Sequence, residues 1–298
     1  MNKFLFWLYF RRLPIDYLDA IYFRFFNRCL LEFYRRGIRF CLNWGLLNLS
    51  AEIAENYVVS LTTYKQRIHW VYLPITSILL GTIRPKKIKL YLSEVEFPNK
   101  WKDLPRELLE LEKLGLEIEF RTKNLKSHKK YCYSFREYSE FKIITIDDDI
   151  IYPADFLERV LSINKKLPKL SIVSFLGMNM EMDEHGKFQS YSSWKYIHEV
   201  RNDTNTIIMG GYGCLYNSPG ELLKFFIEKD AITDFETGDD IYLYYLARKS
   251  GMENYVFGDR YKRFFPILPW AQKTNLYEEN IGGGKNDIML KKMQEMLS

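Results

Sequence analysis

Apolar positions along the chain fall into short runs of strand length that are separated by longer segments of helical period. Pro74 must lie near the start of one of these helices or kink it, and Gly115 marks the end of the next. The pattern predicts strands over 57–61, 87–92, 116–120, 143–146 and 170–176, and helices over 68–81, 104–114, 127–138 and 155–166. Residues 177–210 are polar and predict a long irregular excursion. This order favours an α/β fold of Rossmann-like type, with a mostly parallel central sheet flanked by helices.

Residues 1–50 differ from the rest because they are dense in Phe, Tyr, Trp, Leu and Arg. Pro14 suits the first turn of a helix that runs to about Phe40. At 100° per residue, several arginines fall on one side of this helix and several aromatic residues on the other, although Leu31 and Ile38 fall near the basic side. The basic side holds Arg24, Arg28, Arg35 and Arg39, and the aromatic side holds Tyr22, Phe26, Cys29, Leu30, Phe33 and Phe40.

This segment reads as an amphipathic helical extension, residues 1–50, on a second domain, residues 51–298. No uncharged apolar run approaches the roughly 20 residues that a membrane span needs. One interpretation is a helix lying on the inner membrane surface, with its aromatic side inward and its arginines toward anionic headgroups. The other is a helix that packs on the protein's own core or on a second subunit, which would make the chain an oligomer.

Charge and composition narrow the classes of protein. The chain has 298 residues, of which 47% are hydrophobic, enough for a sizeable core. Residues 1–40 hold eight basic and three acidic residues, which is the whole net charge of +5, and the remainder balances 35 against 35. A nucleic-acid-binding protein normally carries its basic residues on its functional domain, so we expect no nucleic acid partner. Four cysteines without paired spacing, and no signal pattern, favour a cytoplasmic protein. The basic N-terminal segment favours peripheral association with the inner face of the membrane.

Three consecutive carboxylates, Asp147–Asp149, end the apolar run 143–146 near the middle of the chain. This puts them at the carboxyl end of a predicted strand, where open α/β sheets bind ligands, and the loop 62–67 reaches the same edge. Alternation along a strand directs Asp147 and Asp149 to one side and Asp148 to the other. A pair of carboxylates suits Mg²⁺ or Mn²⁺ bound together with a substrate phosphate. An acidic turn or an N-cap cluster is the alternative.

Two later motifs are candidates for the rest of the site. Gly210–Gly213 matches no phosphate-binding fingerprint, and it predicts either close approach of the backbone to a ligand, at Gly211 for example, or an ordinary turn. Asp239 and Asp240 open an apolar helix that runs to Ala247. The helix N-terminus favours their ionised form, and simple capping accounts for one of the two. Asp240 is therefore the candidate general base, with Asp239 beside it.

Taken in order, these segments resemble bacterial GT-A glycosyltransferases of capsule and lipopolysaccharide synthesis. The resemblance covers about residues 56–290, and the acidic triplet is its most specific part. It rests on Val58–Tyr64 with Arg67, Arg84–Ser93, Lys129 and Lys130, Ile144–Pro153, Gly210–Gly213, and Asp239 with Asp240.

The resemblance implies a nucleotide-sugar donor, by default a UDP-sugar, and a glycan or lipid-linked acceptor. Asp147 and Asp149 would hold the Mn²⁺ or Mg²⁺ ion. For Asp148, strand alternation and not the resemblance suggests a role, which is to support the backbone of this donor-binding segment. Thr62, Thr63 and Arg67 would lie against the base and ribose. Lys129 or Lys130 would meet the diphosphate, unless both belong to a solvated helix face. Asp240 would deprotonate the acceptor in an inverting reaction.

One feature departs from that family. A late histidine that often completes the metal site has no counterpart, because the histidines end at His198. Water, Asn280 or Asn286, or no third protein ligand would take its place. A Mg²⁺-dependent nucleotidyltransferase is a rival interpretation, although residues 60–64 contain no glycine for a phosphate loop. A non-catalytic binding module on the same fold is another.

Overall fold

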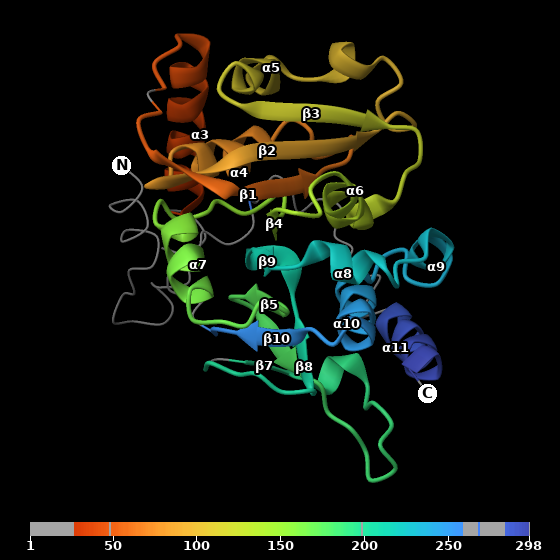
Figure 1. Ribbon diagram of the computed structural model, residues 1–298. Helices are drawn as coiled ribbons and strands as arrows, with labels where there is room; N and C mark the ends of the chain where they lie inside the picture. The colour runs from red at the N-terminus through yellow and green to blue at the C-terminus, as the bar shows by residue number, and fades with distance from the viewer. Residues whose placement is uncertain (1–26, 48, 198, 259–267, 269–283, 298) are drawn as a thin grey trace.

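The computed structural model describes residues 27–47, 49–197, 199–258, 268 and 284–297. In these residues seven strands form a central sheet in the order β10-β5-β9-β4-β1-β2-β3 (Figure 1). All neighbouring strands are parallel except β9, which is antiparallel to both β4 and β5. The strands are β1 Glu52–Thr62, β2 Ile83–Ser93, β3 Leu116–Arg121, β4 Lys142–Thr145, β5 Ser171–Ser174, β9 Cys214–Tyr216 and β10 Glu253–Val256. The prediction of an α/β fold with a mostly parallel sheet is confirmed.

Helices cover both faces of this sheet. Side chains that alternate along each strand point to opposite faces, and those of each face pack with helices in a separate apolar cluster. In β1, Val59 and Leu61 belong to one cluster and Val58 to the other. The first cluster includes residues of α3 Asn27–Asn43, α4 Tyr72–Leu79, α5 Arg106–Glu112 and α7 Phe156–Asn164. The second includes residues of α6 Lys129–Glu137, α8 Pro219–Leu223, α10 Asp239–Ser250 and α11 Lys285–Leu297. The short helix α9 Glu228–Thr233 lies beside α8 (Figure 1).

Two predicted segments differ from the structure. The helix expected from residue 68 begins at Tyr72, because Pro74 lacks an N–H and its ring would clash with a carbonyl one turn earlier. Pro74 therefore lies in the first turn, as predicted. The excursion 177–210 is not irregular throughout, since it contains the antiparallel sheet β7-β6-β8. Its strands β6 Gly177–Asn179, β7 Lys195–Tyr196 and β8 Thr206–Ile208 are too short for alternation to reveal them.

The predicted N-terminal helix is present as α3, and its portion before residue 27 lies outside the described residues. One face of α3 packs against α4 and α5 through buried residues that include Leu31, Tyr34, Ile38 and Leu42. Packing on the protein's own core therefore accounts for this face. None of the described helices combines the length and apolarity needed to cross a bilayer.

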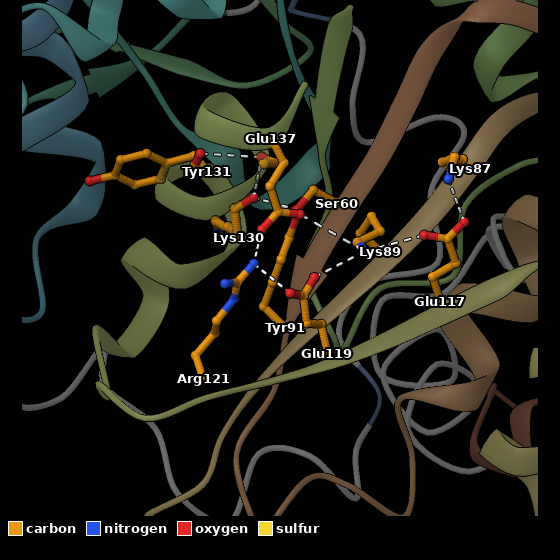
Figure 2. Close-up of polar contacts among 11 residues, drawn as sticks. Ser60, Lys87, Lys89, Tyr91, Glu117, Glu119, Arg121, Lys130, Tyr131 and Glu137 are labelled. Carbon is orange, nitrogen blue, oxygen red and sulfur yellow. Dashed lines mark hydrogen bonds and ion pairs between the residues drawn. The ribbon is translucent and has the colours of Figure 1, made fainter. Parts of the chain in front are cut away.

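A network of ion pairs joins β2, β3 and α6 on one face of the sheet (Figure 2). Lys89 at its centre is buried, and its Nζ lies 3.0 Å from Glu119 Oε2 and 3.2 Å from Glu117 Oε2. Burial lowers the pKa of Lys89, but Glu119, Tyr138 and Glu117 together outweigh burial and raise the pKa overall. The members are Lys87 and Lys89 of β2, Glu117, Glu119 and Arg121 of β3, and Glu137 of α6. The network ties the edge strand β3 to the helix that carries Lys130.

Candidate functional site

The candidate site lies at the carboxyl edge of the central sheet, between the ends of β1 and β4. The strand order runs outward from β1 through β2 to β3 and then resumes on the other side of β1 with β4. Such a switch point leaves a crevice in which α/β proteins bind ligands. Thr62 ends β1, Thr63 and Arg67 follow it, and Asp147–Asp149 follow β4. The prediction that these two segments share one edge is confirmed.

Side chains of the β1 loop hold two of the three carboxylates. Thr63 Oγ1 donates to Asp148 Oδ2 at 2.5 Å. Arg67 Nη1 donates to Asp148 Oδ1 at 2.8 Å and to Asp149 Oδ2 at 2.9 Å. Thr62 is used differently, because its hydroxyl donates to the backbone carbonyl of Tyr91 at 2.7 Å and is thereby engaged within the sheet. Of the two predicted threonines, Thr63 is the one whose hydroxyl bonds to the triplet.

The expectation that Asp148 points away from Asp149 was wrong. Both carboxylates reach the same nitrogen of Arg67. Strand β4 ends at Thr145, so the two-residue alternation that the expectation assumed stops before the triplet and the backbone turns there. Asp147 is the carboxylate that stands apart, because its partner is Lys130.

Lys130 connects the triplet to the later acid pair. Its Nζ donates to Asp147 Oδ1 at 2.7 Å and lies 3.3 Å from Asp239 Oδ2. The hydroxyl of Ser60 on β1 donates to the Lys130 carbonyl, which fixes the start of α6 against the sheet (Figure 2). Burial lowers the pKa of Lys130, but Asp147, Asp239 and Asp240 together raise it well above its usual value. The amine is therefore a permanent positive charge between two acidic groups.

The interpretation of Lys129 and Lys130 as a solvated helix face was wrong, since both side chains are buried. Lys129 serves a different purpose from Lys130. Its Nζ donates to Asn124 Oδ1 at 2.9 Å and to Glu96 Oε2 at 3.3 Å. Burial lowers the pKa of Lys129 despite Glu96. Only Lys130 bonds to the acidic residues predicted for the site.

The glycine segment lies against both acidic groups. The N–H of Gly210 donates to Asp240 Oδ1 at 2.9 Å. A Cβ atom added to Gly211 would lie 3.2 Å from Asp147 Oδ2, so a side chain there would crowd that oxygen. Gly213 has a φ of +96°, and an added Cβ would meet Phe156 at 2.5 Å. Close packing thus requires glycine at Gly213 and favours it at Gly211.

Asp239 and Asp240 begin α10 as predicted, but neither side chain caps the helix, whose N-cap residue is Gly238. Burial would raise the pKa of Asp239, but Lys130 and His128 outweigh burial and lower it. Burial, followed by repulsion from Asp239, raises the pKa of Asp240 to about 8. The expectation that the helix N-terminus keeps both ionised was therefore wrong for Asp240, because burial and a neighbouring charge exceed a helix-end effect.

The triplet offers two oxygens to a cation. Within the described residues, Asp147 Oδ2 and Asp149 Oδ1 accept no hydrogen bond, while their second oxygens are held by Lys130 and Arg67. Burial and Asp148 raise the pKa of Asp149 to about 7. No three acidic, cysteine or histidine side chains of the described chain converge as a metal site. Two carboxylate oxygens plus water and phosphate oxygens still match the usual coordination of Mg²⁺ or Mn²⁺, so these residues fit the ion.

Neither Asn280 nor Asn286 is established as a third protein ligand of the metal ion. Asn280 lies outside the described residues. Asn286 is buried on α11, and no hydrogen bond in the described part of the chain joins it to Asp147 or Asp149.

Tyr152 is a site residue to which sequence reasoning assigned no role. Its hydroxyl accepts the N–H of Asp147 at 3.0 Å and donates to the carbonyl of Gly211 at 3.0 Å. It thereby fixes the first aspartate against the glycine segment. The sequence does offer one indication of this role, because Tyr152 is the residue with a polar group in an otherwise apolar run that follows the triplet. Leu268 also contacts the triplet, because its N–H donates to the carbonyl of Asp149 at 2.7 Å. No sequence pattern predicted this contact.

No protein-family model matches the chain, and no curated protein sequence matches it.

Proposed function

We propose that this chain is a metal-dependent glycosyltransferase of GT-A type that moves a sugar from a nucleotide-sugar donor to a glycan or lipid-linked acceptor. The observation that carries the proposal is the position of Lys130. Its amine joins Asp147, in the carboxylate group that suits a cation and a diphosphate, to Asp239, in the acid pair that suits a reacting hydroxyl. The two chemical needs of sugar transfer, a stabilised leaving group and a base, thus adjoin each other.

The donor side rests on Asp147, Asp149 and the two cationic side chains. Asp147 and Asp149 would hold Mn²⁺ or Mg²⁺, which stabilises negative charge on a leaving diphosphate. Arg67 and Lys130 keep the carboxylates in place through the bonds described above, and each carries further N–H groups that suit phosphate oxygens. Gly211 leaves room beside Asp147 Oδ2.

The acceptor side rests on Asp240. A carboxylate whose pKa lies at about 8 is ionised in an appreciable fraction of molecules near neutral pH, and in that form it accepts a proton well. Asp240 takes the proton of the acceptor hydroxyl as that oxygen attacks the anomeric carbon from the face opposite the leaving diphosphate. The configuration at that carbon is inverted. Asp239, which is paired with Lys130, remains ionised beside it.

We place the reaction at the inner face of the cell membrane, where surface polysaccharides are assembled on lipid carriers. The basic first 40 residues and the exposed aromatic side of α3 support this part of the proposal.

The test is a turnover assay on the purified full-length chain with Mn²⁺ and a panel of nucleotide sugars, including UDP-sugars. We expect slow release of nucleoside diphosphate from one donor without an acceptor, and faster release with a cell-surface glycan extract. Asp240→Asn should lower acceptor-dependent turnover at least about 100-fold, the scale of general-base catalysis, and leave donor binding intact.

The same assay separates the rival functions. Release of pyrophosphate from a nucleoside triphosphate and a sugar phosphate would identify a nucleotidyltransferase. Metal-dependent binding of nucleotide without turnover of any donor would indicate a binding module. Near wild-type turnover by Asp240→Asn would remove Asp240 from its role.

A further inference from the structure

Helix α3 has a second apolar face on the side opposite its buried one. Cys29, Phe33 and Phe40 are spaced by four and seven residues, which places them along one side of the helix. Trp44 is the first residue after α3, and its N–H donates to the carbonyl of Phe40 at 3.1 Å, so it continues the row by a further four residues. We call these four residues the aromatic stripe. Phe33 is 68% exposed, Phe40 57% and Trp44 71%, and Cys29 is also exposed. Three large aromatic side chains exposed in one row are uncommon on a protein surface that has no partner.

Arginines border this stripe. Arg36 and Arg39 are 75% and 56% exposed, and Arg28 is exposed as well. Helix α3 contains four arginines and one glutamate, a net charge of +3. Glu32 is bonded to Arg35 and Arg36, and Arg39 Nε lies 2.6 Å from Glu107 Oε1 of α5. Aromatic side chains with arginines along their border match the headgroup region of an anionic bilayer, where aromatic rings enter the interface and cations meet phosphates.

We infer that the aromatic stripe of α3 docks the protein on an anionic membrane surface. Two other occupants fit the charge less well. A second copy related by two-fold symmetry would place the same arginines near one another, which is unfavourable. Residues 1–26 contain four basic and two acidic residues, so that segment is itself positively charged and would add to the net positive charge of α3. An anionic lipid surface has the opposite charge.

The stripe is linked to the site through the other side of the same helix. The guanidinium of Arg35 lies 5.7 Å from the centroid of the Trp70 ring, and the N–H of Trp70 donates to the carbonyl of Arg67 at 2.9 Å. Docking on α3 would therefore hold the loop that carries Arg67 at a set position relative to the membrane. The inference names the surface for the proposed membrane location, but it does not rest on the proposed chemistry, because lipid binding is measured without a donor.

The experiment is flotation of the full-length chain with two kinds of vesicle. One kind is phosphatidylcholine alone, and the other contains about 30% phosphatidylglycerol, an anionic lipid. We expect flotation with the anionic vesicles only. The variant Phe33→Ser/Phe40→Ser/Trp44→Ser should lower the bound fraction about tenfold. It should keep the wild-type melting temperature, because the replaced side chains are exposed.

A matched control removes three apolar side chains of similar exposure elsewhere. Val95, Val200 and Ile288 are 73%, 66% and 70% exposed, and their triple serine variant should float like wild type. Unchanged flotation of the stripe variant would overturn the inference, because residues 1–26 or another surface would then bind the lipid. Equal loss in the control variant would overturn it as well.

A second measurement covers the case in which the stripe variant folds poorly. Cys29 lies on the stripe, while Cys132 and Cys214 are buried, so an environment-sensitive dye can be attached to Cys29 after Cys41→Ser. Anionic vesicles should shift its emission to the blue. No shift with vesicles, or a shift that instead follows protein concentration together with dimer formation in light scattering, contradicts membrane docking.

Discussion

Replacing Lys130 by Met tests whether its amine binds the two acidic groups together. The side chain is 8% exposed, and its partners Asp147 and Asp239 are 32% and 16% exposed. Removal of one member of a buried ion pair costs about 3–5 kcal/mol, because the remaining charge stays buried. Partial exposure of Asp147 reduces that cost, so we expect Lys130→Met to lower the free energy of unfolding by about 2–4 kcal/mol at pH 7.

Lys129 supplies a matched control one residue away. Both lysines are buried, and burial lowers the pKa of each. The net shift is downward for Lys129, whereas nearby carboxylates make the net shift upward for Lys130. A raised lysine pKa stabilises the folded chain at every pH below the unfolded value, here 10.5, and this stabilisation is lost as the pH rises through the folded value. A lowered lysine pKa has the opposite effect and destabilises the folded chain at neutral pH. Lys129→Met should therefore cost under about 1 kcal/mol at pH 7.

The assay is urea denaturation of the wild type, the two single variants, Asp147→Asn and the double variant Lys130→Met/Asp147→Asn. A coupling free energy of about 1–3 kcal/mol between residues 130 and 147 is expected for side chains in direct contact. The reasoning is refuted if Lys130→Met lies within about 0.5 kcal/mol of wild type, the range of ordinary surface changes. It is also refuted if Lys129→Met costs more than Lys130→Met.

Three further perturbations have defined outcomes. Since the pKa of Asp240 is raised to about 8, the folded chain keeps a proton that the unfolded chain releases near 3.8, and stability should fall as the pH rises between these values. Asp240→Asn should flatten that fall in melting temperatures recorded from pH 5 to 9, and an unchanged slope would count against the buried acid. Gly213→Ala should lower the free energy of unfolding by at least about 1–3 kcal/mol, because φ is +96° and Phe156 blocks the Cβ, and a neutral effect in urea denaturation would contradict that conformation. Lys89→Met should cost about 1–3 kcal/mol, less than a fully buried pair because its glutamate partners are partly exposed, and high salt should change this cost little.

The framework of the fold could be predicted from the sequence because its strands are long or strongly apolar. The run ending at Ile146 and the carboxylates after it determine where the switch point lies, and their position is a local property of the chain. Strands β9 and β10 of the central sheet and the short strands β6–β8 were not predicted, since two to four residues carry too little periodicity.

Details of the site depended on contacts between distant segments. The orientation of Asp148 follows from Thr63 and Arg67, about 80 residues earlier, and not from strand alternation. The burial of Lys130 follows from packing of α6 on the sheet, which no local pattern of lysines reveals. The pKa of Asp240 depends on burial and on Asp239, and these outweigh the helix end that sequence reasoning considered.

Helix α3 shows the same limitation at the level of a whole element. The helical period identified an aromatic side and a basic side, but Leu31 and Ile38, which fall near the basic side, turned out to lie on the face that packs on the core. Sequence alone could not decide which side faces inward. Packing against α4 and α5 decided it and left the aromatic stripe outside.

The most direct test of the account is calorimetric titration of nucleoside diphosphates into the full-length chain, with and without Mn²⁺. The central claim is that Asp147 and Asp149 bind a donor diphosphate through a divalent cation. It predicts saturable binding of at least one nucleoside diphosphate in the presence of Mn²⁺, loss of that binding when Mn²⁺ is removed, and the same loss in Asp147→Asn/Asp149→Asn. Equal binding without the metal, or by the double variant, would contradict the claim.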